Sequence, residues 1–570
     1  MVYYPYVASI VGKRRGKHTY YYLVESARVD GRPRIVSQQY LGTTGEVMAR
    51  LEGAAAGVPD RTQHKRFGDL AAVWGMLQRL EVTDIIDGVV GERRSDAAAS
   101  VGTYLALAAA NRVVAPCSKL AFAEWWDTTA GPRFVRPRLA AAALDHRRFW
   151  DAMDAVSEPQ LVEIERAITA RIIELFDLGL SGVVLDMTNF ATFIDSANTH
   201  APIAQRGKAK QGRSDLRLVG LSLVVTVDGQ VPVVSHAYRG DRPDVTQFVD
   251  VLDELLVRWQ ALGGDPDELT VTDDAGQNST LNHAHVEASG VGYVTSLTPS
   301  GHPDLLAVDV RDFAVVDERR FGSLTAYDSS VEALGVTRRA IVTHSPSFHA
   351  AQVRGFEQTL AKARGRLTGL QARLARGHTR KDGAAIGAEI DRILEPRWLD
   401  RVISVTLTGD TPATRRLIWT TDPRARGRLE DEIFGKRILF TNRDHWSVAE
   451  VVAAYRSQPD VEASFRQLKD PHVVSFSPMH HFTDHKIRVH TFTCVLALQV
   501  AHLMRRDAAR AGLEMSVRRL LATLAGIEET VLLYQGDSGR PRARRMITDL
   551  DPTQQRLFDL FGLDRYAPRR

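Results

Sequence analysis

A glutamate at position 462 stands among aromatic and cationic residues in a segment with helical periodicity. Pro459 suits the first turn of this helix, because the N–H that proline lacks would have no partner there. From that start, Glu462, Arg466 and Lys469 fall on one helical face. An isolated glutamate followed four residues later by an arginine is typical of an ordinary surface ion pair. Two aspartates earlier in the chain favour a role for Glu462 in a catalytic site instead.

Each upstream aspartate follows a strand-like run. Three apolar residues lead directly into Asp186, as in a strand buried on both faces. A shorter run, 269–272, leads into Asp273 and Asp274, which compete for one role because neighbouring strand residues face opposite ways. Asp274 lies 88 positions after Asp186, and Glu462 lies 188 positions after Asp274. Only tertiary folding can unite them, and three carboxylates so placed predict a metal site for phosphoryl transfer.

The elements around these aspartates predict an α/β domain with a mixed sheet. Two strands, 216–227 and 231–238, are joined by an Asp-Gly turn, which is a strong hairpin signal. An amphipathic helix begins at Pro243, and residues 290–297 form a further strand. The order is three strands with a hairpin, then helix, strand, helix and strand.

This order is the ribonuclease-H-like plan, and the chain resembles the DDE transposases of bacterial insertion sequences that carry a Tyr-x2-Arg-x3-Glu-x6-Lys signature. Tyr455, Glu462 and Lys469 stand at the matching positions. The resemblance covers roughly residues 180–300 and 435–505. Several motifs in the right order make it more specific than any single motif.

The chain departs from the signature at Gln458, where the family has an arginine. Arg456 and Arg466 are near enough to substitute. The departure affects a phosphate contact more than the metal site, because arginine grips phosphate in a bidentate geometry. The resemblance implies that Tyr455 and Lys469 hold DNA phosphate.

The resemblance also implies a two-metal reaction with Mg²⁺, for which Mn²⁺ would substitute. Asp186 would bridge both ions, and Asp274 and Glu462 would each complete the shell of one. Two such ions about 3.5–4 Å apart activate the attacking oxygen and stabilise the leaving oxygen at a phosphodiester. Asp274 is preferred to Asp273 because the family's aspartate stands two residues before a glycine, here Gly276.

The implied function is a DNA transposase that cleaves the ends of its own insertion sequence and joins the 3′-OH ends to target DNA. Its partners would be double-stranded DNA, namely the terminal inverted repeats and the target, and a second copy of the chain in a synaptic homodimer. A catalytically inactive DNA-binding relic and a metal-dependent nuclease that does not join strands are the alternatives. The repeat and target sequences and the cleavage pathway, by a hairpin or otherwise, stay open.

The composition is that of a globular protein with several domains, since the chain has 570 residues, of which 44% are hydrophobic and 25% charged. No apolar signal region begins the chain, and the apolar run near Leu496 is shorter than a bilayer requires. A bacterial cytoplasmic, nucleoid-associated location without membrane contact is therefore expected. Cys117 and Cys494 are too few for a disulfide framework, and the histidines between positions 480 and 490 match no zinc spacing.

Residues outside the catalytic region predict further DNA contacts. Positions 1–66 hold eleven Lys or Arg against five Asp or Glu, and phosphate neutralisation drives nucleic-acid affinity. An ordinary solvated face explains this charge equally well. Trp419 is a candidate for stacking on an unpaired base, although a core tryptophan is commoner. The basic candidates in the N-terminal segment are Lys13, Arg14, Arg15 and Lys17.

These patterns divide the chain into six segments. A heptad-like stripe from Val353 to Leu374 and a second apolar stripe from Ile386 to Ile393 predict an antiparallel helical hairpin within an insertion. The segments are 1–67, a basic β-rich DNA-binding candidate; 68–180, helical; 181–298, the first part of the ribonuclease-H-like core; 299–436, a β-rich insertion with the hairpin at about 350–395; 437–505, the second part of the core; and 506–570, helical with a basic loop at 535–545.

Overall fold

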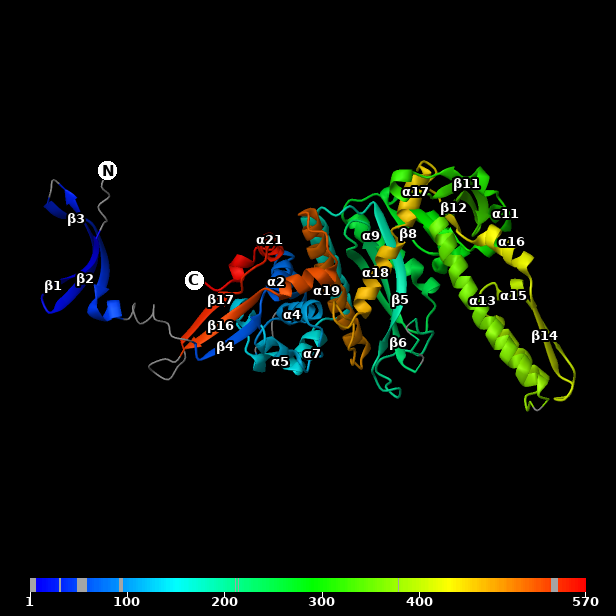
Figure 1. Ribbon diagram of the computed structural model, residues 1–570, viewed down its shortest axis with the longest axis horizontal. Coiled ribbons are helices and arrows are strands. Elements are labelled where there is room, and N and C mark those ends of the chain that lie inside the picture. The colour runs from blue at the N-terminus through cyan, green and yellow to red at the C-terminus, as the bar shows by residue number, and fades with distance from the viewer. Residues whose placement is uncertain are drawn as a thin grey trace. The chain divides into compact units, whose positions relative to one another are not determined.

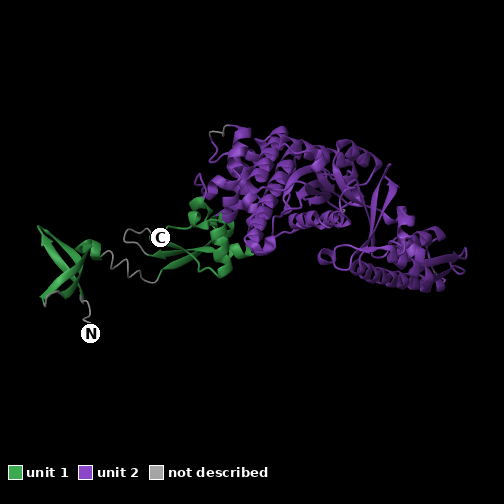
Figure 2. Cartoon of the chain, turned by 90° about the horizontal axis from the view of Figure 1, so that it is seen from above, with its two compact units in different colours: residues 1–71, 127–134, 522–570 green, residues 72–126, 135–521 purple. Residues whose placement is uncertain are grey.

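The computed structural model describes residues 7–29, 32–48, 59–91, 96–210, 212–213, 215–377, 379–534 and 542–569. The chain divides into two compact units, coloured separately in Figure 2. Unit 1 comprises residues 1–71, 127–134 and 522–570, and unit 2 comprises residues 72–126 and 135–521. Of the predicted basic loop at 535–545, residues 535–541 lie outside the described part of the chain.

Unit 2 contains a nine-stranded mixed sheet. Its strands in chain order are β5 (Gly182–Thr192), β6 (Arg217–Thr226), β7 (Pro232–Arg239), β8 (Thr270–Thr272), β9 (Gly292–Leu297), β10 (Ala314–Val315), β11 (Thr325–Ala333), β12 (Val336–His344) and β15 (Lys436–Thr441). In space they follow the order β10-β11-β12-β15-β9-β8-β5-β6-β7. β8 is parallel to both β5 and β9, and the other pairs are antiparallel. The prediction of a mixed α/β fold is therefore confirmed.

The hairpin between β6 and β7 forms where the Asp-Gly turn predicted it. Gly229 has a φ of 81°, a left-handed conformation that glycine adopts without steric cost. The amide of Thr226 donates to the carbonyl of Val231 at 3.0 Å and closes the turn. β6 is buried along its whole length, as expected for a strand covered on both faces.

The two faces of β5 pack against different helices. Leu185 and Met187 belong to the hydrophobic cluster that includes α9 (Phe248–Ala261). Because side chains alternate along a strand, Asp186 points to the opposite face. The helix that packs against β5 and β6 there is α18 (Gln458–Lys469).

The region between residues 68 and 180 is helical, in line with its apolar periodicity. α4 (Val101–Val114) is almost entirely buried and packs along α19 (Asp484–Arg510), which also contacts α7 and α8. The other helices of this region are α2 (Gly68–Arg79), α3 (Val82–Val90), α5 (Phe122–Asp127), α6 (Gly131–Phe134), α7 (His146–Asp154) and α8 (Glu158–Phe176).

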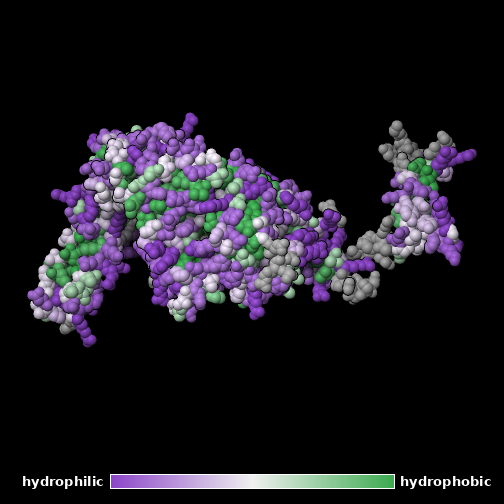
Figure 3. Space-filling model, turned by 180° about the vertical axis from the view of Figure 1, so that it is seen from behind, coloured by the Kyte–Doolittle hydropathy of each residue, from purple (hydrophilic) through white to green (hydrophobic). Residues whose placement is uncertain are grey.

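Among the described helices, only α19 is long and apolar enough to cross a membrane. The sequence predicted an apolar run too short for that, but the helix extends over 27 residues. Of its most apolar stretch, 94% is buried inside the fold, as in the core helix of a globular protein. The face of the molecule in Figure 3 correspondingly shows hydrophobic residues scattered among hydrophilic ones.

The predicted insertion after residue 299 divides into two parts. β10, β11 and β12 extend the central sheet, and β15 returns between β12 and β9. The remainder is an arm, visible in Figure 1, built on α13 (Pro346–Ala375) and α14 (Gly383–Leu394). The predicted seam of α13 is buried from Phe356 to Leu374, facing α14 and the strand β14. The remaining arm elements are α15 (Leu399–Val402), β13 (Ile403–Thr408), β14 (Arg416–Thr421) and α16 (Pro423–Ile433).

Unit 1 contains two three-stranded sheets. The first joins β1 (Val7–Arg15), β2 (His18–Val29) and β3 (Arg32–Thr43). The second joins β4 (Arg61–Arg66) to β16 (Glu528–Tyr534) and β17 (Arg542–Ile547). The C-terminal region, predicted as helical with a basic loop, therefore also contains two strands. One of them, β16, pairs with a segment more than 460 positions away, a contact that no local pattern indicates.

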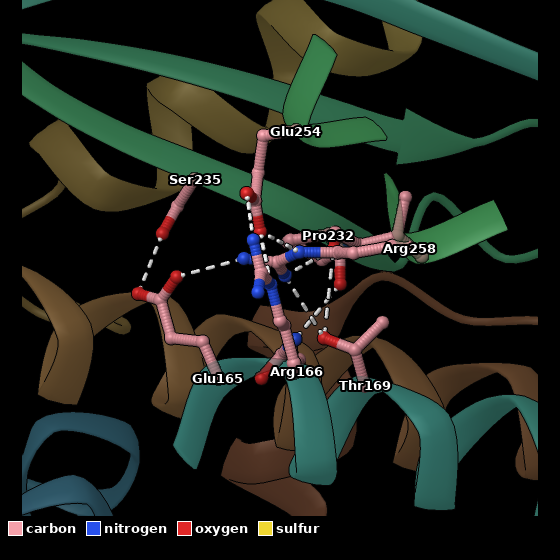
Figure 4. Close-up of polar contacts among 9 residues, drawn as sticks. Glu165, Arg166, Thr169, Pro232, Ser235, Glu254 and Arg258 are labelled. Carbon is pink, nitrogen blue, oxygen red and sulfur yellow. Dashed lines mark hydrogen bonds and ion pairs between the residues drawn. The ribbon is translucent and has the colours of Figure 1, made fainter. Parts of the chain in front are cut away.

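A buried guanidinium links two helices to the sheet in unit 2, as Figure 4 shows. Arg258 of α9 is 8% exposed and donates to the carbonyl of Val233 at 2.6 Å. It also donates to Glu165 of α8 at 3.1 Å and to Glu254 at 2.9 Å. Ser235 of β7 donates to the other oxygen of Glu165 at 2.9 Å. Every charge in this cluster therefore has an opposite partner.

Replacing Arg258 with leucine should lower the free energy of unfolding by about 3–5 kcal/mol, because it leaves a buried carboxylate without its cation. Burial already raises the pKa of Glu165, and Arg258 counteracts that rise. In the variant the folded-state pKa rises further, so the protonated form is favoured in the folded state. The loss of unfolding free energy should therefore be largest above the folded-state pKa of Glu165 in the variant, and it should become smaller as the pH falls.

Urea denaturation of both proteins at about pH 8 and about pH 5 checks this. Arg166→Leu is the matched control, because Arg166 pairs with Glu254 while its side chain is 45% exposed, and exposed pairs contribute at most about 1 kcal/mol. A larger loss for Arg258→Leu at acidic pH than at alkaline pH would contradict the role assigned to Glu165.

Candidate active site

Asp186 lies on the face of β5 that α18 covers. It stands opposite Leu223 of β6, and its Oδ1 accepts the amide of Met187 at 2.7 Å. Burial is the main cause that raises the pKa of Asp186 to about 7; the negative charges of Asp274 and Glu462 contribute, and the Met187 hydrogen bond opposes the rise. The structure thus brings all three predicted carboxylates within electrostatic reach of one another.

The parallel register of β5 and β8 positions Asp274. Val184 pairs with Thr272, so continuing the register by two residues places Asp274 beside Asp186. Asp274 is half-buried, and its Oδ1 accepts the amide of Gly276 at 2.8 Å. The glycine that marks this aspartate in the sequence is therefore part of the turn that orients its carboxylate.

Asp273 faces away from Asp274. It is 6% exposed, and its carboxylate lies near the hydroxyl of Thr295 in the interior. Burial raises the pKa of Asp273 to about 7, and its Oδ1 has no hydrogen-bond partner among the described residues. Asp274, by contrast, lines an open pocket together with Glu462.

α18 positions Glu462. Pro459 lies in its first turn, and Val461, Phe465 and Leu468 are buried, so Glu462 is left exposed on the outer side. At the other end of the helix, the Nζ of Lys469 donates to the hydroxyl of Thr188 at 2.6 Å. Because Thr188 is two residues beyond Asp186, this bond ties α18 to the strand that carries the first carboxylate.

The pocket that Asp274 and Glu462 line has a volume of about 580 Å³, and Asp186 is not among its lining residues. Asp274 and Glu462 form its acidic side, and four cationic residues line it as well. None of Asp186, Asp274 and Glu462 forms an ion pair with any described residue. The cationic lining residues are Arg397, Lys436, Arg437 and Arg456.

These carboxylates are not packed tightly enough to ligate one ion together. Among the described residues, no three Asp, Glu, His or Cys side chains are placed to hold a single metal ion. A pair of Mg²⁺ ions requires fewer protein ligands around each ion, because each ion keeps several waters and takes only one or two carboxylates. Three oxygen donors without compensating cations suit that arrangement.

The predicted phosphate contacts differ in their surroundings. Tyr455 and Arg456 line the pocket, and the guanidinium of Arg456 lies over the ring of Phe321 at 4.8 Å. Arg466 is exposed one turn beyond Glu462 and is not among the lining residues. Lys469 is partly buried beside Thr188. Among the predicted contacts, only Tyr455 and Arg456 therefore lie in the pocket itself.

Two cations near the carboxylates were not predicted. The guanidinium of Arg437 lies 5.6 Å from the ring of Tyr455 and donates to its hydroxyl at 3.4 Å. Lys210 is paired with Asp244 at 2.7 Å and lowers the pKa of Asp186. The sequence carries a signal for Lys210, because four basic residues occur between positions 206 and 213. It carries none for Arg437, which begins an ordinary apolar strand.

Gln458, at the position of the signature arginine, is 8% exposed and also lines the pocket. Its Nε2 has no partner among the described residues. The adjacent Arg437 is held over Tyr455, so the missing guanidinium has a nearby replacement that comes from β15 rather than from α18.

The basic N-terminal candidates belong to unit 1. Lys13 and Arg15 stand opposite Tyr20 and His18, on one face of the sheet, whereas Arg14 points to the other face. Lys13 donates to Gln38 at 2.7 Å and lies over the ring of Tyr22. Lys17 follows the turn at Gly16, so the four cations are divided between both faces and the turn.

Trp419 of β14 lies in the arm of unit 2. It stands opposite Val405 and packs, half-buried, against the hydrophobic cluster of the arm and sheet. Its indole N–H has no hydrogen-bond partner among the residues described. This is the packing of a core tryptophan, with one polar atom unused.

Replacing Asp186 with asparagine should stabilise the protein in EDTA by about 1–2 kcal/mol, because it removes a partly buried charge that two carboxylates oppose. Mg²⁺ should then raise the melting temperature of the original protein more than that of the variant. Thermal unfolding with EDTA or Mg²⁺ measures both effects. Asp215→Asn, which changes an exposed aspartate paired with Arg213, is the control. A variant that is less stable in EDTA would contradict the proposed charge repulsion.

No family model matches this sequence, and no curated protein matches it. Among solved structures, the chain is similar to the piggyBac transposase in a cryo-EM structure of its synaptic complex with hairpin DNA. The TM-score is 0.35 at 8% sequence identity, and the match covers 82% of this chain and 82% of that chain. A likeness this weak identifies neither the fold nor the activity, so the functional assignment rests on the geometry of the site.

Proposed function

We propose that this chain is a DNA transposase that cleaves the ends of its insertion sequence and joins their 3′-OH groups to target DNA. One observation carries the proposal. Asp186 of β5 lies close enough to Asp274 and Glu462 for their negative charges to raise its pKa. Asp274 and Glu462 line a pocket together with four cationic residues. Acidic groups for metal ions and basic groups for phosphate are the two requirements of phosphodiester chemistry.

The proposal includes a ribonuclease-H-like core. β5, β6 and β7 form an antiparallel series, after which β8 and β9 continue the sheet in parallel with β5. The helices α9 and α10 (Thr280–Ser289) connect these strands. This is the order of elements that accompanies the carboxylates in the resembling transposases.

The donor set fits Mg²⁺, with Mn²⁺ able to substitute, because all three side chains offer hard oxygen ligands. Asp186 would contact both ions, and Asp274 and Glu462 one each. Two bound ions would activate the attacking oxygen and stabilise the leaving oxygen of the phosphodiester. No nucleophilic side chain is needed, because the attacking group is water in cleavage and a DNA 3′-OH in joining.

The chain's own residues would bind and orient the strand. Arg437 and Arg456 offer guanidinium groups for phosphate oxygens, each held against an aromatic ring. Lys469 would act indirectly, because its hydrogen bond to Thr188 holds α18, which carries Glu462, against β5. The partners would be the terminal repeats, the target DNA and a second copy of the chain in a synaptic dimer, in the bacterial cytoplasm at the nucleoid.

Replacing Glu462 with glutamine should reduce Mg²⁺-dependent cleavage of DNA bearing the element's ends by more than about a hundredfold, because even outer-shell partners of a metal cost up to that factor. DNA binding should persist, since Glu462 is exposed and supports no packing. Cleavage assays with and without EDTA, beside a binding assay, measure the two effects.

Asp273→Asn is the matched control, because it changes a neighbouring carboxylate that faces the interior instead of the pocket. It should retain cleavage, whereas Asp274→Asn should lose it. Cleavage that survives Glu462→Gln would overturn the carboxylate assignment. Cleavage without joining would favour the nuclease alternative, and binding without cleavage in Mg²⁺ or Mn²⁺ would favour the inactive relic.

Arg437→Gln should weaken DNA binding and reduce the slope of log affinity against log salt by about one, as expected for a lost phosphate contact. Arg466→Gln is its matched control, because Arg466 is equally exposed but lies outside the pocket. Fluorescence anisotropy over a range of salt concentrations measures both. If Arg437→Gln and Arg466→Gln lost equal amounts of DNA affinity, the DNA would lie along the outer face of α18 instead of in the pocket.

A further inference from the structure

A second pocket of about 370 Å³ lies in unit 2 between α4, α7 and the segment that leads into α19. It is distinct from the carboxylate pocket, since the two share no lining residue. None of its eleven lining residues is Asp or Glu, whereas six are Arg, Lys or His. Burial lowers the pKa of His481 to about 3 and the pKa of His490 well below its usual value, so these two imidazoles are neutral. The positive charge of the wall comes from Arg112 and Lys119, and no lining carboxylate balances it.

Arg112 is the most deeply buried cation of this pocket, with 1% of its surface exposed. Its Nη1 donates to the carbonyls of Ser475 at 3.3 Å and Ser477 at 3.1 Å, and its Nη2 to the carbonyl of Cys117. Its Nε has no partner, and no described carboxylate pairs with the guanidinium. A buried cation is costly unless an opposite charge accompanies it.

A second cation stands beside Arg112. Lys119 is half-buried, with its Nζ 5.8 Å from the centre of the Phe149 ring, and it pairs with no described carboxylate. Burial lowers the pKa of Lys119 to about 7, and the charge of Arg112 lowers it further. Asp145 does not relieve this, because its ion pair is with His146.

The imidazole groups add a third feature. His490 is buried and its Nε2 donates to the carbonyl of Phe476 at 2.8 Å, while its Nδ1 has no partner among the described residues. The ring of His481 lies 5.1 Å from that of His490. Because His490 donates through Nε2 and burial lowers its pKa, its Nδ1 is an unpaired acceptor. The unpaired donor among the buried side chains that line this pocket is the Nε of Arg112.

The segment that contributes Pro478, His480 and His481 to this pocket contacts the end of the strand that carries Asp186. The amide of Phe193, just beyond β5, donates to the carbonyl of Met479 at 3.0 Å, and its ring lies 5.7 Å from His480. From Asp186 to Phe193 the extended chain spans roughly 20 Å. That is the axial length of about six base pairs of DNA.

We propose that this pocket binds a phosphate group of the DNA on which the carboxylate site acts, several nucleotides from the bond that is cleaved. A phosphate supplies the negative charge that Arg112 and Lys119 lack, and its oxygens accept from the Nζ of Lys119. That the phosphate belongs to DNA rests on the proposed function, whereas the anion site itself rests on the charges and the unpaired donors.

Cys117 provides a built-in reporter of occupancy. It lines the pocket and is half-buried, and the only other cysteine, Cys494, is buried with its pKa raised by burial to about 11. N-ethylmaleimide should therefore label Cys117 selectively. Duplex DNA carrying the element's end, in EDTA so that no cleavage occurs, should slow this labelling severalfold, as measured by mass spectrometry.

Lys119→Gln should abolish the protection, because it removes a donor and a charge without touching the bonds of Arg112. Arg147→Gln is the matched control, since it removes one exposed positive charge from α7 outside the pocket and should leave protection intact. Glu462→Gln should also be protected normally, so failure of the catalytic proposal and failure of this one are distinguishable.

Potassium phosphate, compared with potassium chloride at equal ionic strength, separates the sources of the anion. Protection by free phosphate but not by DNA would overturn the assignment to DNA, and protection by neither would overturn the anion site. Protection that survives Lys119→Gln would mean that DNA only covers the entrance, and would overturn it too. The salt dependence of DNA binding is a second readout. Lys119→Gln should reduce the slope of log affinity against log salt concentration by about one, whereas Arg147→Gln should not. An unchanged slope for Lys119→Gln would contradict the proposal.

Discussion

The parallel pairing of β5 with β8 is the contact on which the rest of the site depends. Two aspartates that are 88 positions apart become neighbours because the register places residue 184 beside residue 272. A shift of one residue would turn Asp273 towards the pocket and Asp274 inward, because side chains alternate along a strand. The buried β6 and the hydrophobic cluster under β5 hold this register, so the apolar core sets the geometry of the acidic groups.

Charge balance distinguishes the structural parts of unit 2 from its candidate binding sites. Around Arg258 every buried charge has a partner, and the cluster joins α8, α9 and β7. Among the described residues, no cation forms an ion pair with Asp186, Asp274 or Glu462, and no carboxylate pairs with Arg112. Unpaired charge in a partly buried site lowers stability, and unit 2 carries such charge at two places of opposite sign.

Local hydrophobic patterns predicted the helices of the arm correctly, but they did not predict several strands near the edges of the sheets. The seam of α13 was readable because a helix that packs along one side repeats its apolar residues every three or four positions. β11 was not predicted, because an exposed edge region with Asp328, Ser329 and Ser330 shows no apolar run. β16 was missed because one of its partners, β4, comes from the other end of the chain, and β17 pairs with β16 alone.

Local patterns were enough to predict the order of the elements around the carboxylates, the helix around Glu462 and the two aspartates that follow apolar strands. These are local properties, and local hydrophobic periodicity encodes them. The folded structure was needed to show which aspartate faces the pocket, that Arg437 lies against Tyr455, and that Arg112 and Lys119 share a pocket without a lining carboxylate. Those facts depend on strand register and on contacts between distant segments, and nothing in the neighbouring sequence specifies them.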